Sequence, residues 1–175
     1  ICLEPLRAQQ SMGYLPEGAP AWPDMTPRQF LDFVTRIRGL DKAAARSAAH
    51  RAIDMTELHG VLDQPIDTLS KGFRRRVGLA QAIVHDPDIL IMDEPTDGLD
   101  PNQKHQVRAA IREMARTKAI IISTHILEEV DAICTRAMII DRGRLIVEGT
   151  PSALAARSAY HGAVVVTAGS DKACL

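Results

Sequence analysis

Aromatic residues, cysteines and long apolar runs are all scarce in this 175-residue chain. Aromatic residues make up only 3% of it, so the core has to be built from aliphatic side chains. The three cysteines are scattered and lack C-x-x-C spacing, which argues against a disulfide framework or a zinc site and fits a reducing cytosol. No apolar run is long enough to span a bilayer, and the N-terminus does not resemble a signal peptide. A net charge of −1 gives no bulk attraction to nucleic acid.

The N-terminal half of the sequence predicts a small group of helices. Residues 1–25 are rich in glycine and proline, so we expect irregular structure there with one short strand at 12–15. Thr26-Pro27 with Gln29 is a capping box that predicts a helix with Phe30, Leu31, Val34 and Ile37 on its buried face. An alanine-rich helix is expected from about residue 41 to residue 58. These helices predict a helical subdomain over residues 24–86.

The pattern changes after residue 69 to alternating helices and apolar strands. Ser70 is expected to cap a helix that ends before Pro87, and residues 89–93 and 119–123 are expected to be strands buried on both faces. Residues 101–114 and 126–134 are predicted helices, and residues 137–140 a third strand that turns into a hairpin. A short helix from residue 151 and an edge strand at 162–167 complete the prediction. This order predicts an α/β fold with a parallel sheet and right-handed crossovers.

Two adjacent carboxylates follow the apolar run ILIMDE at residues 89–94. In an open α/β sheet ligands bind at the carboxyl ends of the strands, where Asp93 and Glu94 are expected to lie. Neighbouring strand residues point to opposite faces, so the two carboxylates are expected to do different jobs. An acid after an apolar strand is the Walker B arrangement, in which Asp93 would help to hold Mg²⁺ and Glu94 would act on a water. The alternative is that both residues merely end a strand and cap the turn at Pro95.

Four segments in order carry a resemblance to a known family. They are LSKGFRRR at 69–76, ILIMDE at 89–94, GLD at 98–100 and STH at 123–125. In order and spacing they resemble the signature motif, Walker B, D-loop and switch histidine of the ATP-binding cassette (ABC) ATPase family. The resemblance covers residues 11 to about 150, and its subgroup is that of bacterial exporters and gliding-motility systems. It implies a P-loop NTPase-like parallel sheet flanked by helices, with a helical subdomain.

The resemblance assigns roles to residues that have simpler structural readings. It makes Glu94 and His125 catalytic and Asp93 a Mg²⁺ ligand, either alone or together with Glu17. It also implies contacts with ATP, across a dimer, from a second set of residues: Ser70, Lys71, Gly72, Asp100 and Glu17. The simpler readings are helix N-caps for Ser70 and Asp100, a loop glycine for Gly72 and a structural role for His125. The arginines at 74–76 are interpreted as a solvated helix face.

Several positions depart from the family pattern. Glu17 stands where the family's Q-loop has glutamine, and Lys71 and Phe73 replace a glycine and the glutamine of the signature. The sequence has no phosphate-binding G-x-x-x-x-G-K-[ST] loop. Gly13 and Gly18 have the required separation, but Ala19-Pro20 stands where the loop needs lysine and serine or threonine. We therefore expect the chain to be a piece of a longer protein and to bind ATP poorly alone.

The resemblance also implies an organisation and partners. We expect one incomplete ABC ATPase domain over residues 1–175, with a helical subdomain at 24–86, a catalytic α/β core at 87–150 and a C-terminal extension at 151–175. The implied cofactors are ATP and Mg²⁺. The implied partners are a second ABC ATPase subunit and a membrane permease, at the cytoplasmic face of the cell membrane, with no nucleic acid. The alternatives are a soluble ABC ATPase of translation or DNA repair, and a degenerate cassette that acts as an interaction domain.

Overall fold

The computed structural model describes residues 4–157, so the strand expected at 162–167 lies outside the described residues. The chain divides into two compact units, Ile1–Leu127 and Glu128–Leu175. The first unit contains a three-stranded sheet and the second a two-stranded sheet. The predicted division at residues 24, 87 and 151 stays a prediction. In the described part of the chain, no helix is both long and apolar enough to cross a membrane.

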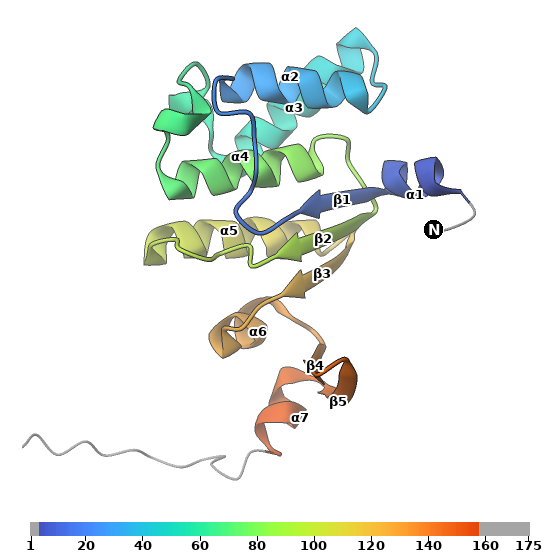
Figure 1. Cartoon of the computed structure of the whole chain (residues 1–175). Helices are drawn as coiled ribbons and strands as arrows, with labels where there is room; N and C mark the ends of the chain where they lie inside the picture. Colours follow the sequence, from blue (N-terminus) through green and yellow to red (C-terminus); the bar gives the residue numbers. More distant parts are fainter. Residues whose placement is uncertain (1–3, 158–175) are drawn as a thin grey trace, which may run out of the picture. The chain divides into compact units, whose positions relative to one another are not determined.

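The first unit alternates helices with three strands (Figure 1). Its elements are α1 (Pro5–Ser11), β1 (Met12–Leu15), α2 (Pro27–Ile37), α3 (Lys42–Thr56), two 3₁₀ turns (His59–Val61 and Ile66–Thr68), α4 (Lys71–Ile83), β2 (Ile89–Asp93), α5 (Pro101–Met114) and β3 (Ala119–Ser123). The three strands are parallel in the order β1-β2-β3, and the parallel pairing of β2 with β3 is the one that the sequence predicts. Asp93 pairs in register with Ser123, so the carboxyl ends of β2 and β3 meet at one edge.

The helices begin at the residues that the sequence marks as caps. The Thr26 hydroxyl accepts from the backbone of Gln29 at 3.3 Å, and the Gln29 side chain accepts from the backbone of Thr26 at 3.0 Å. The Ser70 hydroxyl accepts from the amide of Phe73 at 3.3 Å. These bonds satisfy amides that have no partner within the helix, which fixes where α2 and α4 start.

The core of the first unit is aliphatic. Helix α4 packs against β1, and α2 and α3 pack on α4 on its far side from the sheet (Figure 1). The side chains that are fully buried here include Leu15, Leu31, Leu58, Val77, Leu79, Leu90 and Met92. Three of the six aromatic residues lie together near α2, where the ring centroid of Trp22 is 6.0 Å from that of Phe30 and 4.9 Å from that of Phe33.

The structure corrects three expectations in the first unit. Residues Pro5–Ser11 form α1 where irregular structure is expected, because Pro5 at the first helical position is preorganised for a helix. In α2 the buried face holds Thr35, whose hydroxyl donates to the Asp32 carbonyl at 2.8 Å, while Ile37, the last residue of the helix, is 68% exposed.

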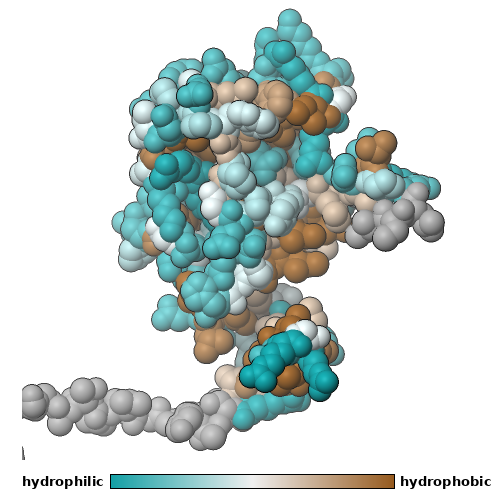
Figure 2. All heavy atoms as spheres, viewed as in Figure 1, coloured by the Kyte–Doolittle hydropathy of each residue, from teal (hydrophilic) through white to brown (hydrophobic). Residues whose placement is uncertain are grey.

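The third correction concerns β2 and β3, which are not buried on both faces. Leu90 and Met92 of β2 are buried but their neighbours are only partly so, and Ile121 of β3 is 57% exposed. β3 is one of the two edge strands of the described sheet, and hydrophobic surface is visible beside the strands in Figure 2.

Helix α6 (Leu127–Ile133) begins at the last residue of the first unit and otherwise belongs to the second. The second unit also contains β4 (Ala137–Asp141), β5 (Arg144–Gly149) and α7 (Pro151–Ala155). The predicted hairpin and the helix after Thr150 are both present. β4 pairs antiparallel with β5 in this hairpin, and the expectation that residues 137–140 also join the parallel sheet stays a prediction. Arg142 and Gly143, at φ 48° and 75°, form the tight turn that brings the two strands together.

Candidate active site

The adjacent carboxylates lie at the carboxyl edge of the sheet, as predicted, and they have different surroundings. Asp93 Oδ1 accepts a hydrogen bond from the Ser123 hydroxyl of the neighbouring strand. Glu94 follows the end of β2, and its amide donates to the Ser123 carbonyl at 3.1 Å. The two side chains therefore meet different groups, which argues against a dyad that shares one proton.

Glu94 is held in an uncommon conformation. Its φ of 47° lies in the left-handed region, which is costly for a residue with a side chain and is typical of functional sites. Its carboxylate accepts from the His125 amide at 3.1 Å and lies 2.7 Å from Nδ1 of the His125 ring. The Thr124 hydroxyl is 3.5 Å from the second oxygen. Glu94 is thus oriented by the loop after β3, and its side chain is only 18% exposed.

The residues at this edge fit Mg²⁺ bound jointly with a nucleotide. Within residues 4–157, no group of three or more acidic, histidine or cysteine side chains is arranged to hold a metal by itself. Mg²⁺ is commonly bound by one or two carboxylates together with waters and substrate phosphates. The Asp93 carboxylate beside the Ser123 hydroxyl supplies hard oxygen donors of this kind.

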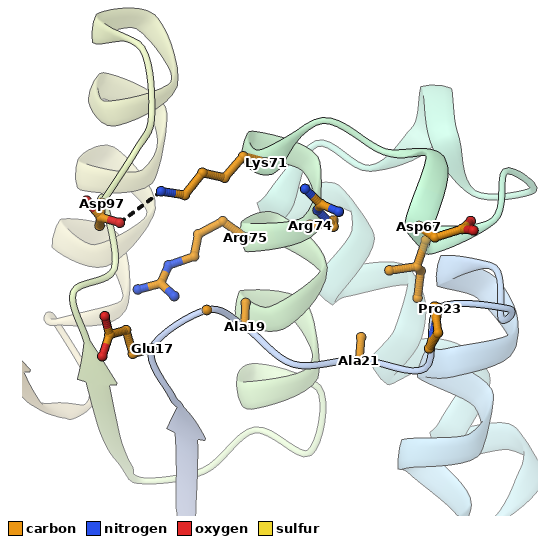
Figure 3. Close-up of a pocket in the computed structure, with 11 residues that line it drawn as sticks. Glu17, Ala19, Ala21, Pro23, Asp67, Lys71, Arg74, Arg75 and Asp97 are labelled. Carbon is orange, nitrogen blue, oxygen red and sulfur yellow. Dashed lines mark hydrogen bonds and ion pairs between the residues drawn. The ribbon is translucent and has the colours of Figure 1, made fainter.

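The signature segment lies at the start of α4 and contacts the segment after β2. Lys71 Nζ is 2.9 Å from Oδ2 of Asp97 (Figure 3). The lysine side chain lies over Gly98, where an added Cβ would come within 2.0 Å of Nζ. A Cβ at Gly72 would come within 2.3 Å of the Gln103 side chain of α5. These glycines therefore allow the signature segment, the D-loop segment and α5 to approach one another closely.

The ion pair between Lys71 and Asp97 gives a prediction about pH. The hydrogen bond from Lys71 lowers the pKa of the Asp97 carboxyl. A carboxyl whose pKa is lower in the folded state contributes stability above its unfolded pKa, and loses it as pH falls through the folded value. We expect Lys71→Met to raise the pKa of Asp97 towards its ordinary value, whereas Lys42→Met at the start of α3 leaves it unchanged. The side-chain carbon chemical shift of Asp97, followed through an acid titration, measures its pKa in both variants. Equal Asp97 pKa values in the two variants would contradict the pairing with Lys71.

Asp100 and Glu17 lie on different parts of the unit. The Asp100 side chain caps α5 by accepting from the Gln103 amide at 2.9 Å, so its simpler reading is confirmed. Glu17 lies on the loop after β1 and lines a cavity of about 660 Å³ together with Lys71, Arg75 and Asp97 (Figure 3). Asp93 does not line this cavity. Shared metal binding by Glu17 and Asp93 stays a prediction.

The interpretation of residues 74–76 as a solvated face is wrong for two of the three arginines. Arg75 and Arg76 are only 5% and 8% exposed. Arg75 lies one helical turn before Leu79, which is itself buried, so its spacing was the signal that it faces inward. Arg75 is the site residue that sequence reasoning missed, because its partners are backbone carbonyls distant in sequence.

Comparisons with known proteins agree with this geometry. Residues 4–97, more than half of the chain, match the family model described as ABC transporter. Nod factor export ATP-binding protein I of Burkholderia orbicola (strain AU 1054) is 39% identical over 160 residues, which is 88% of this chain and 53% of that protein. The protein of the same name from Sinorhizobium fredii (strain NBRC 101917 / NGR234) is 38% identical over 148 residues, 84% of this chain and 43% of that protein. The chain thus spans about half the length of these relatives.

Solved structures give the same result. An ATP-binding subunit of an ABC transporter has a TM-score of 0.75 at 27% identity, over 85% of this chain and 62% of that one. The structure of cbiO1 from Clostridium perfringens, part of the ABC transporter complex cbiONQ, has a TM-score of 0.77 at 28% identity, over 87% and 62%. The fold, the order of the motifs and these matches together show that the chain belongs to the ABC transporter family, as part of its ATPase domain.

Proposed function

We propose that the protein containing this chain hydrolyses ATP as the ATP-binding subunit of an ABC exporter. The observation that carries the proposal is the Glu94 carboxylate, held by the backbone and ring of His125 at the carboxyl edge of a parallel sheet. A carboxylate fixed in this way is suited to take a proton from a water, which contributes typically about 10²–10⁴-fold to a rate.

The residues around Glu94 would bind Mg²⁺ and contact the phosphate. Asp93 would hold Mg²⁺, which when bound offsets the negative charge of nucleotide phosphates. The Ser123 hydroxyl orients the Asp93 carboxylate by donating to it. His125 is 72% exposed on its side chain, so its ring has access to a phosphate while Nδ1 stays beside Glu94. Glu94 positions and activates the attacking water.

The signature segment would act across a dimer. Ser70, Lys71 and Gly72 lie at the start of α4, where free amides and the helix dipole favour a negative group. In a head-to-tail dimer this end would close on the terminal phosphate of ATP held by the partner subunit. Asp100, at the start of α5, would lie at the same interface. The cycle of closing and opening would drive a separate membrane permease from the cytoplasmic face.

The names of the relatives support the proposal that the protein is part of an exporter. Two relatives are named as export ATP-binding proteins, and one solved relative is part of a multi-subunit transporter complex. The phosphate-binding loop is absent from the sequence of this chain. Tests of turnover therefore need the protein that joins this chain to that loop, and we expect this chain alone to bind ATP poorly.

Ser70→Asp tests the signature role without removing the helix cap. Aspartate is as good an N-cap as serine, so α4 keeps its start. Its charge would face the terminal phosphate, and we expect kcat/KM for ATP to fall by about tenfold or more because like charges then meet. The matched control is Thr26→Asp, the same change at the cap of α2, which should leave kcat/KM unchanged.

Steady-state ATP hydrolysis by the protein with its phosphate-binding loop measures both variants. Equal rates for Ser70→Asp, Thr26→Asp and wild type would remove Ser70 from the phosphate site. Absence of hydrolysis in the wild-type protein, together with absence of ATP binding, would support the degenerate-cassette alternative. Stimulation of turnover by a copurifying membrane protein would separate a transporter subunit from a soluble ATPase.

A further inference from the structure

The guanidinium of Arg75 is buried under the catalytic edge. It extends from α4 towards the segment that follows β2, between Glu17 and Asp97 in the view of Figure 3. Its Nη2 donates to the carbonyls of Asp93 and Glu94, and its Nε donates to the carbonyl of Pro95 at 3.3 Å. One side chain thus binds three successive carbonyl groups where the strand ends.

The same guanidinium also reaches the loop after β1. Its Nη1 donates to the carbonyl of Pro16 at 3.1 Å, directly before Glu17. Pro16 and Pro95 are 79 positions apart in the sequence. Arg75 therefore links two loops that are far apart in the sequence.

We propose that Arg75 is the positioning residue that fixes the backbone of Glu94, and with it the direction of the carboxylate that activates water. The proposal rests on the proposed function, because it assigns a role in hydrolysis. The left-handed φ of Glu94, 47°, persists only when its surroundings hold it. The Glu94 carbonyl accepts from Arg75 and from the Asp97 amide, the latter at 3.1 Å, so the turn is held from two sides.

The chemistry of the contact favours arginine over other residues. The guanidinium is planar and presents several N–H donors in a fixed fork, which matches a row of carbonyl oxygens. Burial lowers the pKa of Arg75, while the nearby carboxylates of Asp97, Asp93 and Glu94 raise it. Burial has the larger effect, so the pKa of Arg75 is lowered overall and the acidic groups offset part of the cost of burying the positive charge. Lysine at this position would keep the charge, but its single ammonium group would replace the planar set of guanidinium donors.

Arg75→Lys therefore tests the fork, and Arg76→Lys is its matched control. Arg76 is similarly buried on the same helix, but it binds Glu57 at 3.3 Å and Gln106, away from the catalytic edge. In the protein with its phosphate-binding loop, we expect Arg75→Lys to lower kcat by about 10- to 100-fold, as for a misplaced catalytic group. KM for ATP should change little, and Arg76→Lys should leave kcat unchanged even if its melting temperature falls. Equal losses of kcat in the two variants would overturn the proposal.

A second measurement uses this chain and needs no ATP. Amide hydrogen exchange at Glu94 and His125 reports the two bonds that orient the carboxylate, one to the Ser123 carbonyl and one to Glu94 itself. Arg75→Lys should accelerate exchange at both amides relative to Arg76→Lys, and unchanged exchange would overturn the positioning role. If the wild-type protein hydrolyses no ATP, the proposed function fails. The exchange result then still decides whether Arg75 fixes Glu94.

Discussion

Glu94→Gln is expected to lower ATP turnover by about 10²–10⁴-fold, the usual contribution of a positioned general base. Glutamine has nearly the shape of glutamate, and its carbonyl oxygen can still accept from the His125 amide, which is 3.1 Å from Glu94 Oε1. It cannot take up a proton from water at neutral pH. The geometry of the site should therefore survive while the chemistry stops, and ATP should bind as in the wild-type protein.

Two measurements check this expectation on the protein with its phosphate-binding loop: steady-state hydrolysis, and equilibrium binding of Mg-ATP. Glu113→Gln makes the same charge change on α5, where Glu113 pairs with Arg116 at 3.3 Å on the exposed surface, and it should hydrolyse ATP normally. Normal turnover by Glu94→Gln would show that another group activates the water. Loss of both binding and turnover would indicate that Glu94 acts in holding the nucleotide.

Gly13→Ala is expected to destabilise the first unit by about 3 kcal/mol, at the upper end of the usual cost of overpacking. Gly13 lies in β1 in register with Leu90. A Cβ at Gly13 would come within 2.1 Å of the Ala82 carbonyl and 2.7 Å of Leu90 Cδ2. The first of these neighbours is backbone of α4, which cannot move aside without separating the helix from the sheet.

Gly60→Ala is the matched control, because nothing lies within 4 Å of the Cβ it would add. It should be neutral or slightly stabilising, since alanine reduces the freedom of the unfolded chain. Urea unfolding of the chain, followed by circular dichroism, compares the two midpoints. Similar midpoints would mean that α4 and β1 have more room between them than their contact implies.

The parts of the fold that sequence predicted best are those fixed by local chemistry. Thr26, Ser70 and Asp100 each cap a helix where expected, because a cap is decided by a side chain and the amides two or three residues later. The strands at 89–93 and 119–123 are predicted by their apolar runs, and their parallel pairing by the helix between them. The placement of Asp93 and Glu94 at the sheet edge follows from the same pattern.

The errors came where distant segments decide the outcome. Ile37 has the helical spacing of a buried residue, but its exposure depends on what α2 packs against. The burial of Arg75 depends on carbonyls contributed by Pro16 and Pro95, which local spacing does not bring together.

The contacts of Arg75 also affect what comparison among relatives can detect. A bond to a backbone carbonyl makes no demand on the side chain of the residue that accepts it. Substitutions at Pro16 or Pro95 can therefore occur without any compensating change at Arg75, provided that the path of the backbone is kept. Covariation between aligned positions would show no signal for this link, even though it joins the loop after β1 to the residue proposed to activate water.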